Sequence, residues 1–266
     1  MARSFLATSS QHLEVASAPV TAVPLSIAVW VMISGTLTAT RRIVSLSDPD
    51  GASETAFYLH SVSGQVIGRT VNAGSGAQAV SSVGIVADTW HHMCVVFSAV
   101  NARAAYLDGG NKGTNTGSIT PAGIEKTLIG AREVTSTKSQ FMNGRVAEVA
   151  IWNVALNDAE VLALSGGIAP PYVRPGNCVA YYPLWGLHSP EIDLCPVPQS
   201  LTLVNAPPIA NHAPVTPFSA RFWTPMPVIE SAVDVSAPPF FRRGQLVPGD
   251  SGSLNRPLSV PYRLPV

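Results

Sequence analysis

The segment RVAEVAIWNVALNDAEVLALSGG, residues 145–167, decides the fold class because it joins a β-strand to one short helix. Its first part is rich in β-branched and apolar residues, which is typical of a strand in a sheet. We expect Ala147, Val149 and Ile151 to share one face of this strand. Glu148 is expected on the opposite face, so a single carboxylate marks the strand.

The second part of the segment predicts a helix over about residues 158–165. Asn157 is a suitable N-cap, and Glu160 three residues later completes a capping box. Gly166 and Gly167 end the helix. A helix this short is not stable in isolation. We therefore expect it to pack on a sheet and to cover an open end of a β-sandwich.

The chain before this segment consists of short β-rich runs separated by clusters of Gly, Ser, Asn and Asp. The clearest runs are SFLAT, LSIAVWVMI, RRIVSLS, AFYLHSV, QVIGRTV, HHMCVVFS, ARAAYLDG and KTLIGAR. In HHMCVVFS, Met93, Val95 and Phe97 are expected on one face. The motifs DPDG at 48–51 and DGGNKG at 108–113 predict turns. Many short strands with regular turns predict a two-sheet sandwich.

The composition excludes some classes of partner. Only 12% of the 266 residues are charged and the net charge is zero, so we expect no electrostatic binding of nucleic acid or membrane. The N-terminus lacks the pattern of a secretory signal. The longest apolar run, around 24–33, is too short to span a bilayer. The low charge fits a surface covered by partner chains, or an ordinary surface rich in small polar residues.

Proline divides the chain into parts. Residues 1–168 contain four of the 23 prolines, and the remainder lies in 169–266. Since proline is excluded from central strands, we expect residues 1–168 to form the sandwich. Residues 169–206 then supply its closing strands and loops, in NCVAYYPLW and QSLTLVN. Residues 207–266 form an extended Pro-rich C-terminal arm.

The arm keeps many aromatic residues, unlike a free disordered linker. The alternatives are an arm that inserts into a partner and an arm that lies back on its own domain. For docking on a partner, the predicted anchors are Phe218, Phe222, Trp223, Phe240, Phe241 and Tyr262. The arm also contains GDSGS at 249–253, which resembles the segment around a serine-protease nucleophile but is expected to be a turn.

The sequence resembles the laminin-G-like, concanavalin A-like jelly rolls, especially their pentraxin-like branch. The residues that carry the resemblance are Trp90-His91-His92, Tyr106-Leu107-Asp108-Gly109, Gly130, Phe141, Gly144-Arg145, Glu148, Trp152 and Leu156. The match covers roughly residues 3–168 and extends to about 206. It implies an all-β jelly-roll sandwich in which the short helix caps one end. The fold alone does not specify a function, because it hosts lectins, adhesion modules, hydrolases and virion parts.

The resemblance also implies where ligands would bind. Many such domains hold Ca²⁺ at a loop rim through carboxylates, and Asp48, Asp50 and Asp108 are the candidates, with ordinary turn chemistry as the alternative. Trp30, Trp90 and Trp152 are expected in the core. The aromatic residues left for stacking on a sugar are Tyr58, Tyr106, Trp185 and Tyr181 or Tyr182.

We expect no enzymatic activity. Glycoside hydrolysis needs two carboxylates in one cleft, and Glu148 has no acidic neighbour at a spacing of two. His91 and His92 are adjacent on a strand, so they point to opposite faces and cannot chelate one metal. The three cysteines argue against a disulfide framework and leave open whether Cys178 and Cys195 pair.

Two functional hypotheses follow. The first is a virion structural protein of a tailed bacteriophage, such as a capsid decoration or tail-associated protein, assembled in the host cytoplasm. It would dock on other virion proteins through the arm, self-associate, and display its laminin-G-like domain outward. The second is a carbohydrate-binding or adhesion module, in which a glycan is the partner and Ca²⁺ assists.

Overall fold

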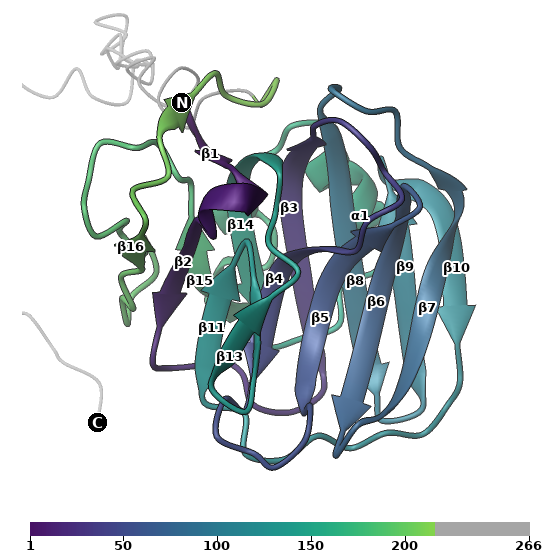
Figure 1. Ribbon diagram of the computed structural model, residues 1–266. Coiled ribbons are helices and arrows are strands. Elements are labelled where there is room, and N and C mark those ends of the chain that lie inside the picture. The colour runs from purple at the N-terminus through teal and green to yellow at the C-terminus, as the bar shows by residue number, and fades with distance from the viewer. Residues whose placement is uncertain (216–266) are drawn as a thin grey trace, which may run out of the picture. The chain divides into compact units, whose positions relative to one another are not determined.

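The computed structural model describes residues 1–215 of the chain, and they form two large antiparallel sheets with one α-helix (Figure 1). The predicted all-β jelly-roll sandwich is thereby confirmed. Within the described range, no helix is long and apolar enough to cross a membrane.

The first sheet has eight strands in the order β10-β9-β8-β3-β14-β1-β17, and β15 also pairs with β14. Two of its long central strands, β3 and β14, lie side by side although they are far apart in the sequence. The strands are β1 (Ala2–Phe5), β3 (Leu25–Ile33), β8 (His91–Ala99), β9 (Ala102–Leu107), β10 (Gly110–Asn115), β14 (Gly144–Trp152), β15 (Cys178–Tyr182) and β17 (Ile209–Ala210).

The second sheet has seven strands in the order β16-β2-β11-β4-β5-β6-β7. They are β2 (His12–Val15), β4 (Arg41–Ser47), β5 (Ala56–Val62), β6 (Gln65–Asn72), β7 (Ser75–Gly84), β11 (Lys126–Ile129) and β16 (Thr202–Val204). A separate hairpin, β12 (Arg132–Val134) and β13 (Thr137–Ser139), lies in front of β11 and β4 in Figure 1. This hairpin brings charged side chains to the outer face of the seven-stranded sheet.

The main core lies between the two sheets. Met93, Val95 and Phe97 are fully or almost fully buried in it, so their predicted common face is confirmed. Phe97 of the first sheet meets Phe57 of the second edge to face, with ring centroids 5.3 Å apart. This geometry is favourable for aromatic pairs and ties the two sheets together.

The prediction that Ala147, Val149 and Ile151 share one face is wrong for Ala147. Val149 and Ile151 belong to the main core, whereas Ala147 packs with Trp30 in a separate cluster. The register with β3 shifts between Ala147 and Ala150, and Glu148 has a φ of 54°. The shift is a β-bulge, and one extra residue reverses the alternation of faces.

The helix α1 (Asp158–Ser165) forms where it was predicted and has the predicted capping box. Asn157 Oδ1 accepts from the Glu160 amide at 3.0 Å, and Glu160 Oε2 accepts from the Asn157 amide at 2.8 Å. The short 3₁₀ helices are η1 (Ala7–Ser9), η2 (Pro170–Tyr172) and η3 (Pro175–Asn177).

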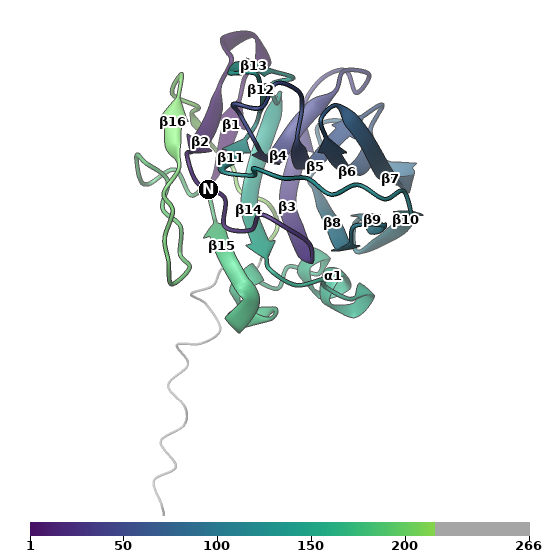
Figure 2. The same cartoon turned by 90° about the horizontal axis from the view of Figure 1, so that it is seen from below.

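The predicted position of α1 at an open end of the sandwich is wrong. Val161 and Leu164 pack in a second apolar cluster with residues of β8, β9 and β14, including Trp152. Figure 2 shows α1 as a third layer, outside the eight-stranded sheet. Gly109 permits this approach, because a Cβ there would lie 3.0 Å from the Leu162 Cα. The apolar outer face of the sheet, including Val96 and Tyr106, requires this cover.

Candidate functional site

Loops at one end of the seven-stranded sheet enclose an open pocket of about 410 Å³, here called the loop-rim pocket. They are the β4–β5 loop, the β6–β7 turn and the segment around 122–123. The lining residues are Asp48, Gly51, Ala52, Ser53, Thr55, Asn72, Ala73, Ala122 and Gly123. The volume lies within the range of small-molecule sites, and the polar side chains of Asp48, Ser53, Thr55 and Asn72, four of the nine lining residues, suit a ligand rich in hydroxyl groups.

The shape of the pocket depends on hydrogen bonds between its loops. Thr55 Oγ1 accepts from the Ala73 amide at 3.0 Å and so links the β4–β5 loop to the β6–β7 turn. Asp48 Oδ1 accepts from the amides of Asp50 and Gly51 at 3.1 and 2.9 Å. Asp48 Oδ2 makes neither of these bonds and lies beside Gly51 and Gly123, where a Cβ would crowd it. The glycines therefore leave room around one carboxylate oxygen.

The calcium candidates fall in two places. Asp48 and Asp50 share the β4–β5 loop, and Asp48 lines the pocket. Asp108 follows β9 of the other sheet, where its carboxylate accepts from the His92 amide at 2.9 Å and meets His91 Nδ1 at 2.7 Å. Within residues 1–215, no group of three or more His, Cys, Asp or Glu side chains is placed to hold a metal ion. Calcium binding stays a prediction.

Three arginines converge on one carboxylate on the outer face of the seven-stranded sheet, and we call this group the arginine cluster. Glu54 Oε1 lies 2.6 Å from Arg132 Nη1 and 3.6 Å from Arg42 Nη2. Glu54 Oε2 lies 4.0 Å from Arg69 Nη2. The four side chains carry three positive charges and one negative charge, so the cluster has a net charge of +2.

Two neutral rings lie against the arginine cluster. The Arg42 guanidinium carbon is 4.0 Å from the centre of the Tyr58 ring, a cation–π geometry, and the His60 ring stands edge-on to Tyr58. Burial, together with the nearby guanidinium groups of Arg42, Arg69 and Arg132, lowers the pKa of His60 to about 2. Burial also lowers the pKa of Arg42 to about 10. His60 is therefore neutral, and Arg42 stays charged at neutral pH.

Several buried polar atoms of this cluster have no hydrogen-bond partner in the part of the chain that the structure describes. They include Arg42 Nη1 and both ring nitrogens of His60. Arg42 and His60 are each 4% exposed. An unpaired buried donor or acceptor costs about 1–3 kcal/mol, so native proteins usually avoid one or use it.

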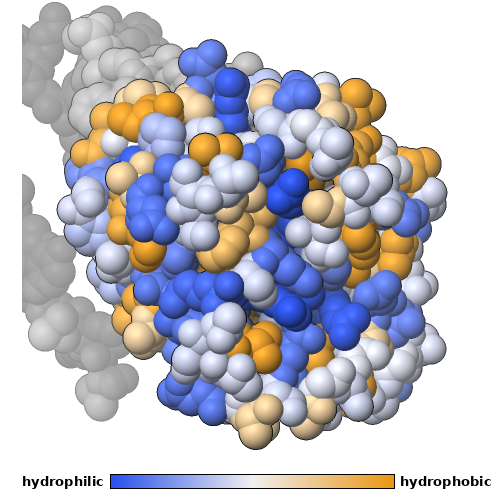
Figure 3. All heavy atoms as spheres, in the orientation of Figure 1, coloured by the Kyte–Doolittle hydropathy of each residue, from blue (hydrophilic) through white to orange (hydrophobic). Residues whose placement is uncertain are grey.

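The other half of the same face carries a balanced group, the lysine–glutamate network. Lys126 Nζ lies 2.7 Å from Glu133 and 3.1 Å from Glu14, and Lys138 Nζ lies 3.3 and 3.1 Å from the same two carboxylates. The two ammonium groups and two carboxylates alternate in a closed ring with no net charge. Figure 3, which views this side of the molecule, shows hydrophilic residues gathered in a band across the middle.

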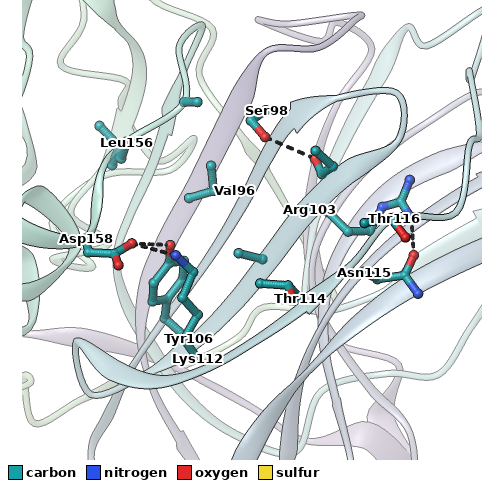
Figure 4. Close-up of a pocket in the computed structure, with 13 residues that line it drawn as sticks. Val96, Ser98, Arg103, Tyr106, Lys112, Thr114, Asn115, Thr116, Leu156 and Asp158 are labelled. Carbon is teal, nitrogen blue, oxygen red and sulfur yellow. Dashed lines mark hydrogen bonds and ion pairs between the residues drawn. The ribbon is translucent and has the colours of Figure 1, made fainter.

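A second pocket, of about 270 Å³, lies on the outer face of the eight-stranded sheet beside the start of α1 (Figure 4). Asp158 Oδ1 accepts from Tyr106 Oη and from Lys112 Nζ, each at 2.8 Å. Across the pocket, Arg103 Nη1 donates to Asn115 Oδ1 at 2.6 Å. These polar groups already bind one another, so a ligand would have to displace internal bonds. This favours the loop-rim pocket.

The prediction that tyrosines are available for stacking on a sugar is wrong. The side chains are covered by α1, by the sandwich core or by Arg42, and none is more than 3% exposed: Tyr58, Tyr106, Tyr181 and Tyr182. Trp185 is half-buried. The core positions predicted for Trp30 and Trp152 are confirmed, and the half-buried Trp90 packs beside Trp30. These four tyrosines are therefore not available to stack on a sugar.

The predicted arm anchors lie outside the described residues. They are Phe218, Phe222, Trp223, Phe240, Phe241 and Tyr262, and GDSGS at 249–253 lies outside them as well. Docking through the arm stays a prediction. Of the segment 207–266, residues 209–210 form β17, which pairs with β1 of the eight-stranded sheet.

Cys178 and Cys195 are free thiols in the structure, although their sulfur atoms are only 3.9 Å apart. Burial raises the pKa of Cys178, and it raises the pKa of Cys195 to about 11. Both thiols are therefore protonated at neutral pH. Cys94 is buried in the apolar cluster under α1, as expected for a small apolar side chain.

Glu148 has structural partners in place of a second catalytic carboxylate. Its Oε2 accepts from Tyr181 Oη at 2.6 Å, and its Oε1 lies 3.1 Å from His212 Nε2. Burial and this carboxylate raise the pKa of Tyr181, which keeps the phenol protonated as a donor. The Glu148 side chain thus links β14 to Tyr181 of β15 and to His212.

Sequence reasoning missed the arginine cluster, although its strands were predicted. A signal was present: Tyr58 and His60 alternate with apolar residues on β5, and Arg69 stands at the matching position on β6. The register pairs Tyr58 with Arg69, so both face outward. Arg132 and Glu54 come from a hairpin and a loop, and no local pattern connects them to these strands.

Comparison with known proteins identifies the family. Residues 7–162 match the Laminin_G_3 family, described as the Concanavalin A-like lectin/glucanases superfamily. No curated protein matches the sequence. Among solved structures, a candidate carbohydrate binding protein from Bacteroides ovatus has a TM-score of 0.56 and 15% identity, covering 81% of this chain and 61% of its own.

Two other structures are similar over shorter parts of the chain. A heptameric SAP-like pentraxin from Limulus polyphemus has a TM-score of 0.42 and 22% identity, covering 60% of this chain and 78% of its own. A CBM40 domain of a Ruminococcus gnavus IT-sialidase, bound to α2,3-sialyllactose, has a TM-score of 0.47 and 13% identity, covering 55% of this chain and 84% of its own. Because the family match spans more than half of the residues, the chain belongs to the Laminin_G_3 family of concanavalin A-like proteins.

Proposed function

We propose that this protein is a non-enzymatic carbohydrate-binding module and that the loop-rim pocket binds the sugar. The observation that carries the proposal is the pocket itself, an open space of about 410 Å³ lined by carboxylate, hydroxyl and amide groups. The family includes lectins, and the Bacteroides ovatus protein with the same fold is a candidate carbohydrate binding protein. Both facts support the proposal.

The chemistry of the pocket matches that of sugar hydroxyl groups. Each hydroxyl donates one hydrogen bond and accepts others, and a carboxylate is a strong acceptor for such a donor. Asp48 supplies a carboxylate oxygen with free space beside it, while Ser53 is exposed and Asn72 is half-exposed at the opening. The small side chains of Ala52 and Ala122 leave the opening unobstructed.

The experiment is a glycan array with the full chain, followed by titration calorimetry on the best ligand. Ala52→Trp fills the opening at an exposed position, and Ala159→Trp makes the same change on an exposed position of α1. We expect Ala52→Trp to abolish binding and Ala159→Trp to retain it. No binding to any glycan, with calcium or with chelator, would contradict the proposal.

Repeating the titration with EDTA tests the calcium prediction separately. A loss of affinity that calcium restores, and that Asp48→Asn prevents, would support an ion at the β4–β5 loop. Equal affinity with and without EDTA would mean that the sugar binds without the ion.

The virion role stays a second prediction, favoured by the 12% charged residues and the aromatic, Pro-rich segment 207–266. None of the proteins named above is a virion protein. Limited proteolysis with mass spectrometry tests this role: cleavage after about residue 207 that leaves a stable core would fit an arm awaiting a capsid or tail partner. A resistant chain would contradict a free arm.

A further inference from the structure

The arginine cluster holds more positive charge than its own partner neutralises. Within residues 1–215, Glu54 is the single carboxylate within 4.0 Å of Arg42, Arg69 and Arg132. The remaining side-chain partners are neutral: Gln140 accepts from Arg42 Nε at 2.6 Å, and Ser139 Oγ accepts from Arg132 Nε at 3.0 Å. Two of the three positive charges are therefore left without a counter-charge in the described part of the chain.

The fold does not need this excess positive charge to cover the outer face of the sheet with polar side chains. The lysine–glutamate network lies on the same face, uses side chains of the same hairpin, and pairs its two ammonium groups with two carboxylates. One half of the face is thus covered by equal numbers of positive and negative charges. The other half keeps its excess positive charge, and Arg42 Nη1 and the two ring nitrogens of His60 have no hydrogen-bond partner among residues 1–215.

Part of the cluster is open to solvent. The side chains of Arg69 and Arg132 are 29% and 25% exposed, while Arg42 lies beneath them at 5%. A guanidinium presents a planar fork of N–H groups that fits a carboxylate or sulfate. Arg69 is held loosely, because Gln78 Oε1 and Glu54 Oε2 lie 3.5 and 4.0 Å from its nitrogens. It is the side chain most free to meet an incoming anion.

The cluster and the loop-rim pocket are neighbours along the chain. Glu54 belongs to the cluster and the next residue, Thr55, lines the pocket. The Glu54 carbonyl also accepts from the Gly74 amide at 2.8 Å, which holds the end of the β4–β5 loop against the β6–β7 turn of the pocket.

We propose that the arginine cluster binds an anionic group, a carboxylate or a sulfate, carried by an acidic polysaccharide whose neighbouring sugar occupies the loop-rim pocket. This inference rests on the proposed carbohydrate binding. It makes the ligand class acidic glycans and makes Arg69, Arg132 and Arg42 the residues that select them over neutral glycans.

The test compares matched acidic and neutral polymers with the full chain. Polygalacturonate is compared with its methyl ester, and dextran sulfate with dextran, by titration calorimetry at several salt concentrations. Arg69→Gln removes one charge of the cluster, and Lys138→Gln, whose parent side chain is 25% exposed, removes one charge of the balanced network. Arg132→Gln is the second cluster variant, and circular dichroism confirms that each variant is folded.

We expect an acidic polymer to bind better than its neutral partner and to weaken about tenfold in Arg69→Gln, the loss of one charge-assisted hydrogen bond. Lys138→Gln should bind as the parent does. Equal binding of acidic and neutral polymers, unaffected by Arg69→Gln, would overturn the inference and leave the carbohydrate-binding proposal intact. Equal weakening in Arg69→Gln and Lys138→Gln would also overturn it, because the effect would then be unspecific.

A sulfate arm separates the two proposals. The thermal midpoint is measured in sodium sulfate and in sodium chloride at equal ionic strength, for the parent chain, Arg69→Gln and Lys138→Gln. An extra stabilisation by sulfate that Arg69→Gln loses and Lys138→Gln keeps would support the anion site even if no glycan bound. If Arg69→Gln keeps the full sulfate effect and no acidic polymer binds, the anion site is refuted.

Discussion

The outer face of the seven-stranded sheet carries charged side chains in both halves, and the two halves differ in how these charges are balanced. In one half, two lysines and two glutamates from β2, β11 and the β12–β13 hairpin close a neutral ring, and every charge has two opposite neighbours. In the other half, Arg42 of β4, Arg69 of β6 and Arg132 of the hairpin share Glu54, and Arg42 lies over the neutral Tyr58 ring. Paired charges neutralise one another. An excess of positive charge lowers the stability of the fold but favours the binding of an anion.

The largest effect is expected from Glu54→Gln, which leaves the three guanidinium groups without a carboxylate. We expect the free energy of unfolding to fall by about 3 kcal/mol, the usual loss when one partner of a buried charge group is removed. Urea unfolding measures it, and added sulfate should restore part of the loss. A loss below about 1 kcal/mol would mean that solvent already neutralises the arginines.

The balanced half should respond less to the equivalent change. Glu133→Gln leaves Lys126 and Lys138 paired with Glu14 alone, so we expect a loss of about 2 kcal/mol in the free energy of unfolding. Urea unfolding at low and high salt is the measurement, and sulfate should have no special effect. A larger loss than that of Glu54→Gln would reverse the contrast between the halves.

Acid should destabilise the arginine half through His60. Its folded pKa of about 2 lies below the model-peptide value of 6.5, so the unfolded chain takes up a proton first as the pH falls. Stability is complete above pH 6.5 and falls by about 1 kcal/mol between pH 6.5 and 5.5 for this histidine. His60→Gln should remove that part of the loss.

His92 is a second buried histidine, and its contribution to acid destabilisation is present both in the parent chain and in His60→Gln. Burial lowers its pKa to about 4, so it should contribute to acid destabilisation with the same sign and over the range from pH 6.5 to 4. Urea unfolding at each pH compares the parent with His60→Gln. Identical pH dependence in both proteins would show that His60 gains a partner or becomes protonated in the folded state.

The smallest effect is expected from Arg69→Gln. Its contacts are long and its side chain is 29% exposed, so the change in the free energy of unfolding should stay within about 0.5 kcal/mol. The same urea measurement would reveal a larger loss, which would show that Arg69 supports the fold. An unchanged free energy of unfolding would mean that Arg69 is not needed for stability, which agrees with the proposed role in ligand binding.

Much of the fold was predictable from local patterns. The capping box of Asn157 and Glu160 acts within one turn, and the alternation of Met93, Val95 and Phe97 reflects the two faces of a strand. The predictions that were wrong concern features set by contacts between segments far apart in the sequence. The bulge at Glu148 moved Ala147 to the other face, and α1 covered a sheet face whose apolar character is shared by five strands.

The candidate site was predictable only in part. Asp48 was identified from its turn motif and does line the loop-rim pocket. The tyrosines were misjudged, because their exposure depends on the layer above them. The arginine cluster was missed, since Arg42 and Arg132 are 90 positions apart in the sequence and meet only when the hairpin folds over β4.

The sequence by itself determined the sandwich, its single capped helix and the turn that carries Asp48, because strand alternation, capping and turn chemistry act over a few residues. Only the tertiary structure decided which charges share a surface. Pairing between strands sets the register and brings Tyr58 opposite Arg69, and long-range packing brings Glu54 to three arginines. Electrostatic balance is a property of neighbours in space, and the chain order does not record it.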